Sequence, residues 1–219
     1  MYGRRKFIGH ALFGLLLFGE MGKVVMTGLS KAWGAAKKTI LPPGTKREDL
    51  INENPAHLDP RNLETTPLEE FGTMGLSDHM VSLDHWRLKV SGHVKKPARL
   101  TYAQVQALPS IEKDGLLICP GFFASYGQWK GISLREILRI AGERPGITHV
   151  TVSGPESPYK KEVRFPIKDV REDKVFLAYA VNGKALPLQH GFPLRVVAED
   201  YYGYDWVKYV DNIRVDKIG

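Results

Sequence analysis

Alternating apolar and polar positions mark several short stretches of the chain and predict β-strands. In the first of them, Trp86, Leu88 and Val90 alternate with polar neighbours. The other stretches of this kind are residues 149–154, 161–167, 175–187, 193–199 and 206–215. One of them contains Asn182-Gly183, the strongest hairpin signal in the chain, because both residue types accept the positive φ of a tight hairpin turn. We therefore expect a protein rich in strands and turns.

An apolar run followed by a turn predicts a strand that ends at the single cysteine. Residues 116–118 are all apolar, which is typical of a buried strand. Pro120-Gly121 follows Cys119 directly and predicts a turn. The thiol is therefore expected at a strand end, where functional sites are often built.

Two short amphipathic helices are predicted among the strands. Thr101 is a candidate N-cap for the first, and Pro109 ends it. Ser133 is a candidate N-cap for the second, and Gly142 ends it. The apolar face of this second helix consists of Leu134, Ile137, Leu138 and Ala141. Strands outnumber helices and are separated by turns rather than crossover helices, so we predict an α+β fold with mixed or antiparallel sheets and a few short helices.

The first 36 residues have the pattern of an export signal. A basic start precedes an apolar run from Phe7 to Gly19, which is shorter than the roughly 20 residues that a membrane-spanning helix needs. Arg4-Arg5 resembles the paired arginines of a twin-arginine signal, a route for folded enzymes that carry cofactors. We expect a periplasmic or extracytoplasmic protein, and an uncleaved signal that serves as a membrane anchor is the alternative.

The rest of the chain divides into an arm and one domain. Residues 37–80 are rich in Pro, Asn and charge without a sustained period, which predicts an extended arm over the domain surface. Residues 81–219 are expected to form the domain, to which the arm contributes. The formal net charge is +7, of which +4 falls in the first 36 residues. The remaining +3 is too small to predict a nucleic-acid partner.

Cys119 is the main candidate for chemistry. A lone cysteine cannot form an internal disulfide, so the thiol is packing, an intermolecular link or a ligand. The sequence gives weak support to a Cys-His pair, lacks the further cysteines of a zinc site, and has no glycine-rich phosphate loop after a strand. A single soft thiolate suits a transition metal that takes its other ligands from elsewhere, such as an organic dithiolene.

Two segments resemble the sulfite oxidase family of molybdopterin oxidoreductases. The first is CPGFFASYGQWKGISLREIL, where a cysteine and a small turn precede Trp-x-Gly and an amphipathic helix. The second is LPLQHGFPLRVVAEDYYGYDWVKYV, and PLEEFGTMG is a weaker third match. Trp129 and Gly131 of the first segment are expected to shape the turn into the helix. The resemblance implies the family's molybdopterin-binding fold and a cofactor of molybdenum and molybdopterin.

The resemblance also implies roles for single residues. Cys119 would be the catalytic residue and the only protein ligand to molybdenum, whose charge would keep the thiol deprotonated. Arg195 and Lys208 would hold the phosphate of the pterin, and His190 would hydrogen-bond the pterin or its phosphate. The further implied cofactor contacts are Trp206, Val207, Glu70, Phe71 and Ser153, with Gly154 as the alternative to Ser153.

The implied activity is a two-electron oxo transfer with a sulfur oxyanion or an S-oxide as the small-molecule substrate. A protein methionine sulfoxide reductase-type catalytic subunit is one alternative, and a non-catalytic exported binding or assembly module is an alternative of another class. A pocket lined by two or three arginines would favour sulfite-like anions, and an open, shallow pocket would favour sulfoxides. The arginines in question are Arg87, Arg99, Arg164 and Arg171, and the candidates for the substrate rim are Tyr126, Lys130, Lys160 and Lys161.

The expected electron-transfer partner and oligomeric state follow from two features that the sequence lacks. With one cysteine, a Cys-x-x-Cys-His haem motif is impossible, so we expect electrons to pass through a separate, haem-containing protein. Membrane association is expected only through the signal or this partner. The immunoglobulin-like dimerisation domain common in the family does not follow the cofactor domain here, from which we expect a monomer.

Overall fold

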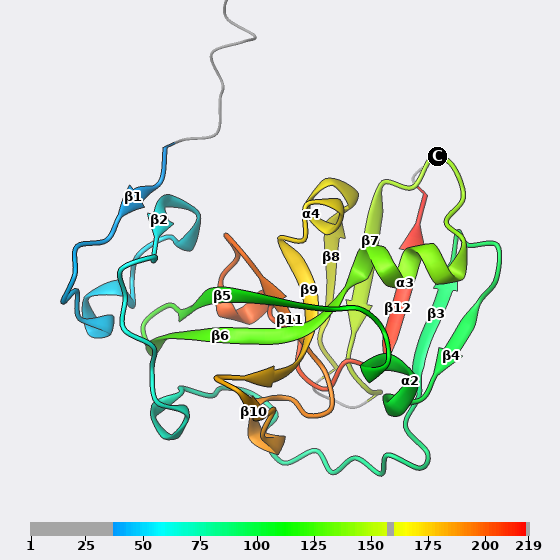
Figure 1. Ribbon diagram of the computed structural model, residues 1–219, viewed down its shortest axis with the longest axis horizontal. Coiled ribbons are helices and arrows are strands. Elements are labelled where there is room, and N and C mark those ends of the chain that lie inside the picture. The colour runs from blue at the N-terminus through cyan, green and yellow to red at the C-terminus, as the bar shows by residue number, and fades with distance from the viewer. Residues whose placement is uncertain (1–36, 157–159, 218–219) are drawn as a thin grey trace, which may run out of the picture. The chain divides into compact units, whose positions relative to one another are not determined.

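The computed structural model describes residues 37–156 and 160–217, so the predicted export signal lies outside the described residues. Two five-stranded sheets carry the fold, and a two-stranded sheet lies in the N-terminal arm (Figure 1). The strands are β1 Thr39–Ile40, β2 Leu58–Asp59, β3 Leu88–Gly92, β4 Ala98–Leu100, β5 Ser110–Cys119, β6 Phe123–Ser133, β7 His149–Ser153, β8 Glu162–Pro166, β9 Val175–Val181, β10 Lys184–Ala185, β11 Arg195–Ala198 and β12 Asn212–Asp216. The α-helices are α2 Tyr102–Gln106, α3 Leu134–Ala141 and α4 Ile167–Arg171. The 3-10 helices are η1 Arg47–Leu50, η2 Pro55–His57, η3 Leu68–Glu70, η4 Leu188–His190 and η5 Gly203–Asp205.

The first sheet has the order β10-β9-β6-β5, and β11 also pairs with β9. All of these pairings are antiparallel. β5 and β6 form a long hairpin in which Cys119 stands opposite Phe123, so the thiol lies at the hairpin's turn, as predicted. The second sheet has the order β4-β3-β12-β7-β8, with a parallel pairing of β12 with β3 and antiparallel pairings elsewhere. The predicted α+β class with mixed and antiparallel sheets is confirmed.

The expectation that Trp129 and Gly131 shape a turn into the helix is wrong. Both residues lie inside β6, which runs directly into α3 at Ser133. Gly131 sits beside a β-bulge, and a Cβ on it would lie 1.9 Å from the carbonyl oxygen of Leu177 on β9. Glycine is therefore required by the close approach of two strands.

Local signals placed the helices and the hairpin correctly. Thr101 and Gln104 form a capping box at the start of α2. Ser133 is the N-cap of α3, and Gly142, with a φ of 64°, is its C-cap. Asn182 and Gly183 have φ angles of 50° and 72° and connect β9 to β10. The predicted strand over 206–215 is shorter than expected, because only its last part, from residue 212, pairs in the second sheet.

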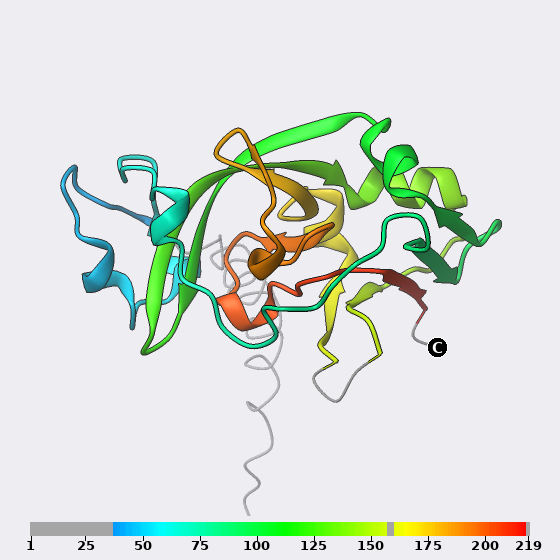
Figure 2. The same ribbon diagram turned by 90° about the horizontal axis from the view of Figure 1, so that it is seen from below.

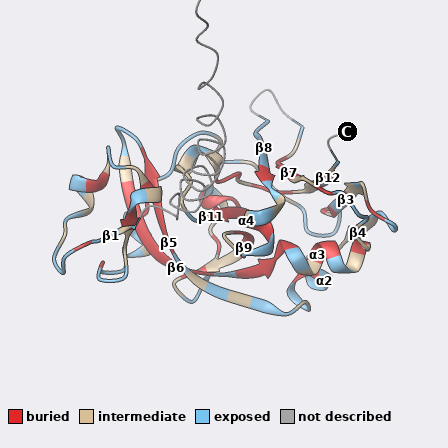
Figure 3. Cartoon of the chain, turned by 90° about the horizontal axis from the view of Figure 1, so that it is seen from above, coloured by how far each residue is buried: buried red, intermediate tan, exposed pale blue. Residues whose placement is uncertain are grey.

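The N-terminal arm packs against the β5–β6 hairpin rather than only crossing the surface. The arm lies beside the hairpin (Figure 2). Four leucines of the arm form a hydrophobic cluster with apolar side chains of the hairpin. The buried members are Leu41, Leu50, Leu58, Leu63, Leu116, Ile118, Ala124 and Tyr126. The main core lies between the sheets, and Figure 3 shows buried positions along β5, β6, β9 and β11. Ile118 therefore faces the arm cluster, while the next residue, Cys119, faces the opposite side of the strand.

Candidate active site

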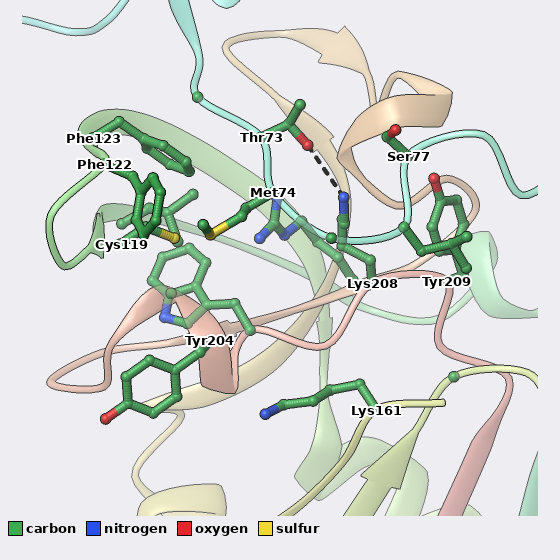
Figure 4. A pocket seen from close by; sticks show the side chains of 18 of the residues that line it. Thr73, Met74, Ser77, Cys119, Phe122, Phe123, Lys161, Tyr204, Lys208 and Tyr209 are labelled. Carbon is green, nitrogen blue, oxygen red and sulfur yellow. Dashed lines mark hydrogen bonds between the residues drawn. The ribbon is translucent and has the colours of Figure 1, made fainter. Parts of the chain in front are cut away.

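A cavity of about 840 Å³ opens beside the turn of the β5–β6 hairpin (Figure 4). Four segments line it: residues 72–78, residues 117–123, the ends of the loop between β7 and β8, and residues 195–209. Its described lining includes four cationic side chains, Lys160, Lys161, Arg195 and Lys208. Asp78 is the only acidic side chain in this described lining. The cavity is therefore suited to a ligand that carries negative charge.

Cys119 is the last residue of β5, and its side chain lines the cavity with only 8% of the residue exposed. Burial raises the pKa of the thiol, while the charges of Arg195 and Lys208 act in the opposite direction. Gly203 passes so close that a Cβ on it would lie 2.5 Å from the Cys119 Sγ. Across residues 37–156 and 160–217, no group of three or more His, Cys, Asp and Glu side chains could hold a metal ion. A metal bound at this thiol would therefore need its other ligands from a non-protein group.

Arg195 is a buried cation without a carboxylate partner in the described part of the chain. Its guanidinium lies beside a pair of edge-on indoles, 5.1 Å from the Trp129 ring centroid and 5.6 Å from that of Trp206. Nη1 donates to the carbonyl oxygen of His190 at 3.2 Å, but the buried Nε has no hydrogen-bond partner. Burial lowers the pKa of Arg195 to about 10, so it remains charged at neutral pH. A buried charge with an unused donor predicts an anionic ligand at this position.

Lys208 provides a second cation at the cavity wall. Its Nζ donates to Thr73 Oγ1 at 3.1 Å (Figure 4). It also donates to the carbonyl oxygen of Gln189 at 3.1 Å. Burial, followed by repulsion from Arg195, lowers the pKa of Lys208 to about 8. Both hydrogen bonds are to neutral groups, so the positive charge is available to an anion in the cavity.

His190 accepts a hydrogen bond from Arg195 at its backbone carbonyl and is not among the described residues that line the cavity. Its ring packs edge-on against Phe71, at a centroid distance of 6.0 Å. Burial and the charges of Arg195 and Lys208 lower the pKa of His190 to about 4, so the imidazole is neutral at pH 7. Nδ1 is buried without a hydrogen-bond partner. The position favours a role in holding Arg195 through the backbone carbonyl.

Four other residues proposed for the cofactor do not line the cavity. Glu70 is exposed, and its carboxylate bonds to the Arg47 guanidinium at 2.6 Å, which holds it on the surface of the arm. Phe71 is buried against Trp129. Ser153 accepts a hydrogen bond from Asn212 in the sheet, and Val207 is in the core. The cavity is instead lined by neighbours of these residues: Gly72, Gly154, Trp206 and Lys208.

Of the four residues proposed for the substrate rim, two line the cavity and two do not. Lys160 and Lys161 line the cavity, whereas Tyr126 is buried in the arm cluster and Lys130 is exposed outside the described lining. None of the four arginines considered for substrate lines it. Arg164 pairs with Asp216, Arg171 pairs with Glu143, Arg87 donates to backbone carbonyls, and Arg99 is exposed on β4.

Sequence reasoning missed several wall residues. They are the segment 72–78, Phe122, Phe123, Gly203 and Tyr204. Residues 72–75 stood inside the weaker match PLEEFGTMG but were not singled out, and residues 76–78 have no periodic pattern that could have placed them. Phe122 and Gly203 stood inside the recognised segments, where an apolar residue in a turn and a glycine before Trp206 were the available signals.

The sequence model of the family described as "Oxidoreductase molybdopterin binding domain" matches residues 76–218. The chain belongs to this family. The predicted sulfite oxidase-family membership is thereby confirmed, and the chain is an oxidoreductase domain. Molybdenum with molybdopterin is its cofactor.

Relatives of this molybdopterin-binding domain include reductases of different length. The protein-methionine-sulfoxide reductase catalytic subunit MsrP of Gluconobacter oxydans (strain 621H) is 30% identical over 147 residues, which covers 59% of this chain and 46% of that protein. NADH nitrate reductase of Lotus japonicus is 32% identical over 162 residues, which covers 60% of this chain and 18% of that protein. The chain therefore spans about half of the first relative and less than a fifth of the second.

The fold also occurs in a solved structure. The sulfane dehydrogenase SoxCD of Paracoccus pantotrophus superimposes with a TM-score of 0.60 at 20% identity, covering 95% of this chain and 56% of that chain. This similarity confirms the predicted fold type.

The residues present fit the cofactor. Arg195 offers a buried charge and an unused Nε donor, Gly203 leaves space at the thiol, and the cavity lining is mainly cationic among its charged residues. A soft thiol with no nearby protein co-ligands in the described chain suits a metal held by dithiolene sulfurs.

Among the described residues, no helix is long and apolar enough to span a membrane.

Proposed function

We propose that this chain is an exported molybdopterin oxidoreductase that reduces an organic S-oxide, with Cys119 as the protein ligand to molybdenum. When bound, the cofactor supplies two-electron chemistry at an oxygen atom of the substrate. The observation that carries the proposal is the placement of the buried Cys119 thiol at the wall of a cavity with Arg195 and Lys208 on its inner side and three large exposed apolar side chains at its mouth.

The inner side of the cavity suits the cofactor's anionic part. Arg195 packs against both Trp129 and Trp206 and donates to the His190 carbonyl oxygen, which leaves its Nε free to bind a phosphate. Lys208 would add a second positive charge. Its Nζ would give up its present hydrogen bonds to neutral acceptors and bind this anion instead. Gly203 leaves the Cys119 thiol room at the metal.

The mouth of the cavity favours an organic S-oxide over sulfite. Three large apolar side chains at the mouth are exposed to solvent: Met74 by 45%, Phe122 by 65% and Tyr204 by 57%. Two exposed lysines share the mouth, Lys160, paired with Glu156, and Lys161, whose Nζ lies 5.8 Å from the Tyr204 ring centroid. An exposed apolar patch indicates contact with an apolar partner or substituent. Arg195 is the only arginine in the described lining, and it is buried, so an arginine-rich pocket for a sulfur oxyanion is not present in the described residues.

Export and electron supply belong to the same proposal. The paired Arg4-Arg5 and the apolar run after it support export by the twin-arginine route to the periplasm. The relative MsrP is named as a catalytic subunit, which supports a separate protein as electron donor here. With one cysteine in the sequence, a covalently attached haem of the Cys-x-x-Cys-His type is excluded, so the donor is expected to carry its own redox group.

Metal analysis of natively exported protein tests the role of Cys119. We expect about one molybdenum per wild-type chain with pterin present. Cys119→Ser should lose turnover but keep most of the pterin, because Arg195 and Lys208 are unchanged. Lys130→Ala, an exposed residue outside the cavity lining, is the control and should behave as wild type. Folded wild-type protein without molybdenum and pterin would favour the non-catalytic binding module.

Steady-state assays decide the substrate class. With a reduced viologen dye as electron donor, the wild-type enzyme should reduce methyl phenyl sulfoxide. Phe122→Ala should raise KM for this substrate more than KM for dimethyl sulfoxide, which lacks the ring. Rapid oxidation of sulfite without sulfoxide reduction would instead assign the enzyme to sulfur oxyanions.

A further inference from the structure

Two methionines lie in the described part of the chain, and their surroundings differ. Met74 is 45% exposed and lines the same cavity as Cys119. Figure 4 shows its side chain pointing into this cavity, towards Cys119. Met80 is 78% exposed and lines a separate, smaller cavity of about 220 Å³ with His79 and Trp86. Both thioethers can meet an oxidant from solvent, but only Met74 does so at the mouth of the proposed active site.

The segment that carries Met74 is held at its start. The Gly72 N–H donates to Ser125 Oγ at 3.2 Å. Thr73 Oγ1 donates to the carbonyl oxygen of Gln189 at 3.0 Å and accepts from Lys208 Nζ. In the described chain, no backbone–backbone hydrogen bond involves residues 74–78. Gly75 has a φ of 69° and open space around it. Rotation of the unbranched Met74 side chain can therefore move its sulfur within the cavity without breaking secondary structure.

We propose that Met74 is a reversible oxidation site that the chain's own active site repairs. The inference rests on the proposed function as an S-oxide reductase. Hydrogen peroxide transfers one oxygen to the thioether, so its O–O bond breaks and it leaves as water while the sulfur is oxidised by two electrons. In the return step, two electrons from the donor and two protons convert the sulfoxide to the thioether, and the oxygen leaves as water.

Tethering makes this repair independent of a second copy of the enzyme, although it still takes electrons from the donor. A sulfoxide on Met74 stays beside Cys119 at a high effective concentration, whereas a sulfoxide on Met80 can be reduced only by a second copy of the enzyme. While oxidised, Met74 occupies the mouth of the cavity and competes with external substrate. The enzyme would therefore be slowed by an oxidant until its own turnover restores Met74.

Peptide mass spectrometry of the full-length, cofactor-loaded enzyme tests the proposal. The protein is oxidised with hydrogen peroxide, freed of peroxide, diluted and given reduced viologen dye. About half or more of the Met74 sulfoxide should disappear, because peroxide forms two epimers and a site can accept one or both. Met80 sulfoxide should persist. The rate at Met74 should not change on tenfold dilution, and apoprotein treated in the same way should keep both sulfoxides.

Visible absorbance of the cofactor gives a second readout. Peroxide-treated wild type, once reduced and separated from excess dye, should reoxidise without added substrate, and so should Met80→Leu. Met74→Leu should remain reduced. The inference is overturned if Met74 sulfoxide persists while free methionine sulfoxide is reduced by the same preparation, or if Met74 and Met80 lose oxygen equally. If neither free nor protein-bound sulfoxide is reduced, the proposed function fails as well.

Discussion

At the scale of single residues, Gly203 shows how the lack of a side chain leaves space for the sulfur atom of Cys119. Its φ is not in the left-handed region, so the backbone alone does not require glycine. A Cβ would instead lie 2.5 Å from Cys119 Sγ and 2.8 Å from Leu117 Cδ1. Glycine is therefore needed for the room it leaves to the thiol at the end of β5.

A double-mutant cycle on the apoprotein measures how strongly a side chain at position 203 interferes with the Cys119 thiol. Gly203→Ala should cost about 1–3 kcal/mol of unfolding free energy by overpacking, and clearly less when Cys119 is already alanine. Urea denaturation of wild type, the two single variants and the double variant gives the coupling free energy between positions 203 and 119. In loaded Gly203→Ala, X-ray absorption should show one sulfur ligand fewer at molybdenum. Equal costs in both backgrounds would contradict the role given to Gly203.

The sequence allowed the prediction of residues whose type carries the chemistry. Cys119, Arg195 and Lys208 were named from short segments, and all three line the cavity. Glu70 was named from a weaker segment, and its carboxylate turns outward to Arg47. Phe122 was not singled out, because the exposure of an apolar side chain at a turn depends on neighbours that are distant in the sequence.

At the scale of elements, ion pairs attach the start of the arm to the loop after β11. Lys38 Nζ lies 2.6 Å from Asp200 Oδ1, and Lys174 Nζ lies 2.9 Å from Asp200 Oδ2. Burial acts to raise the pKa of Asp200, but hydrogen bonds and charges from Lys38 and Lys174 outweigh it, and the pKa is lowered. The carboxylate thus binds its proton more weakly in the folded chain than in the unfolded chain.

This difference predicts a pH dependence of stability. A lowered folded-state pKa contributes stability above the unfolded value of about 4, and that contribution is lost as pH falls through the folded value. Asp200→Asn should cost about 1 kcal/mol at pH 7, and the difference from wild type should shrink steadily as pH falls below the unfolded value. Asn suits the φ of 74° at this position. Urea denaturation from pH 2.5 to 7 checks this, with Glu143→Gln, in an exposed ion pair, as the control. A cost independent of pH would contradict it.

The elements with strong local signals were predictable. Thr101, Ser133 and Gly142 marked the ends of α2 and α3, and Asn182-Gly183 marked the hairpin. β6 was missed, because its small and polar residues, such as Gly127 and Gln128, hide the alternation of a strand. Its identity depends on pairing with both β5 and β9, which no local pattern contains.

At the scale of the whole molecule, the arm and the sheets form a continuous packed structure. Leu50 of η1 is 3% exposed and belongs to the cluster that covers the β5–β6 hairpin. Ile118 of the same cluster precedes Cys119. Packing of the arm is therefore coupled to the strand that carries the thiol. The composition of the arm did not predict this, because its leucines are widely spaced in the sequence.

Substitution of Leu50 tests whether the arm unfolds with the domain. Leu50→Ala should lower the free energy of unfolding by about 2–5 kcal/mol, within a single transition. Ile40→Ala, at a 48% exposed position of the same arm, should change it by less than about 0.5 kcal/mol. Fluorescence and circular dichroism should give coincident curves. A separate early transition in Leu50→Ala would show that the arm is independent.

The order of the cavity walls along the chain has a consequence for biosynthesis. The segment 72–78 is made early, the thiol at residue 119 follows, and Arg195 and Lys208 are made last. A ribosome-bound chain that has not yet passed residue 208 has the thiol but lacks the cationic wall. The cavity is therefore complete only once the chain has been made through Lys208, and a chain cut before this residue should retain less pterin than the full chain.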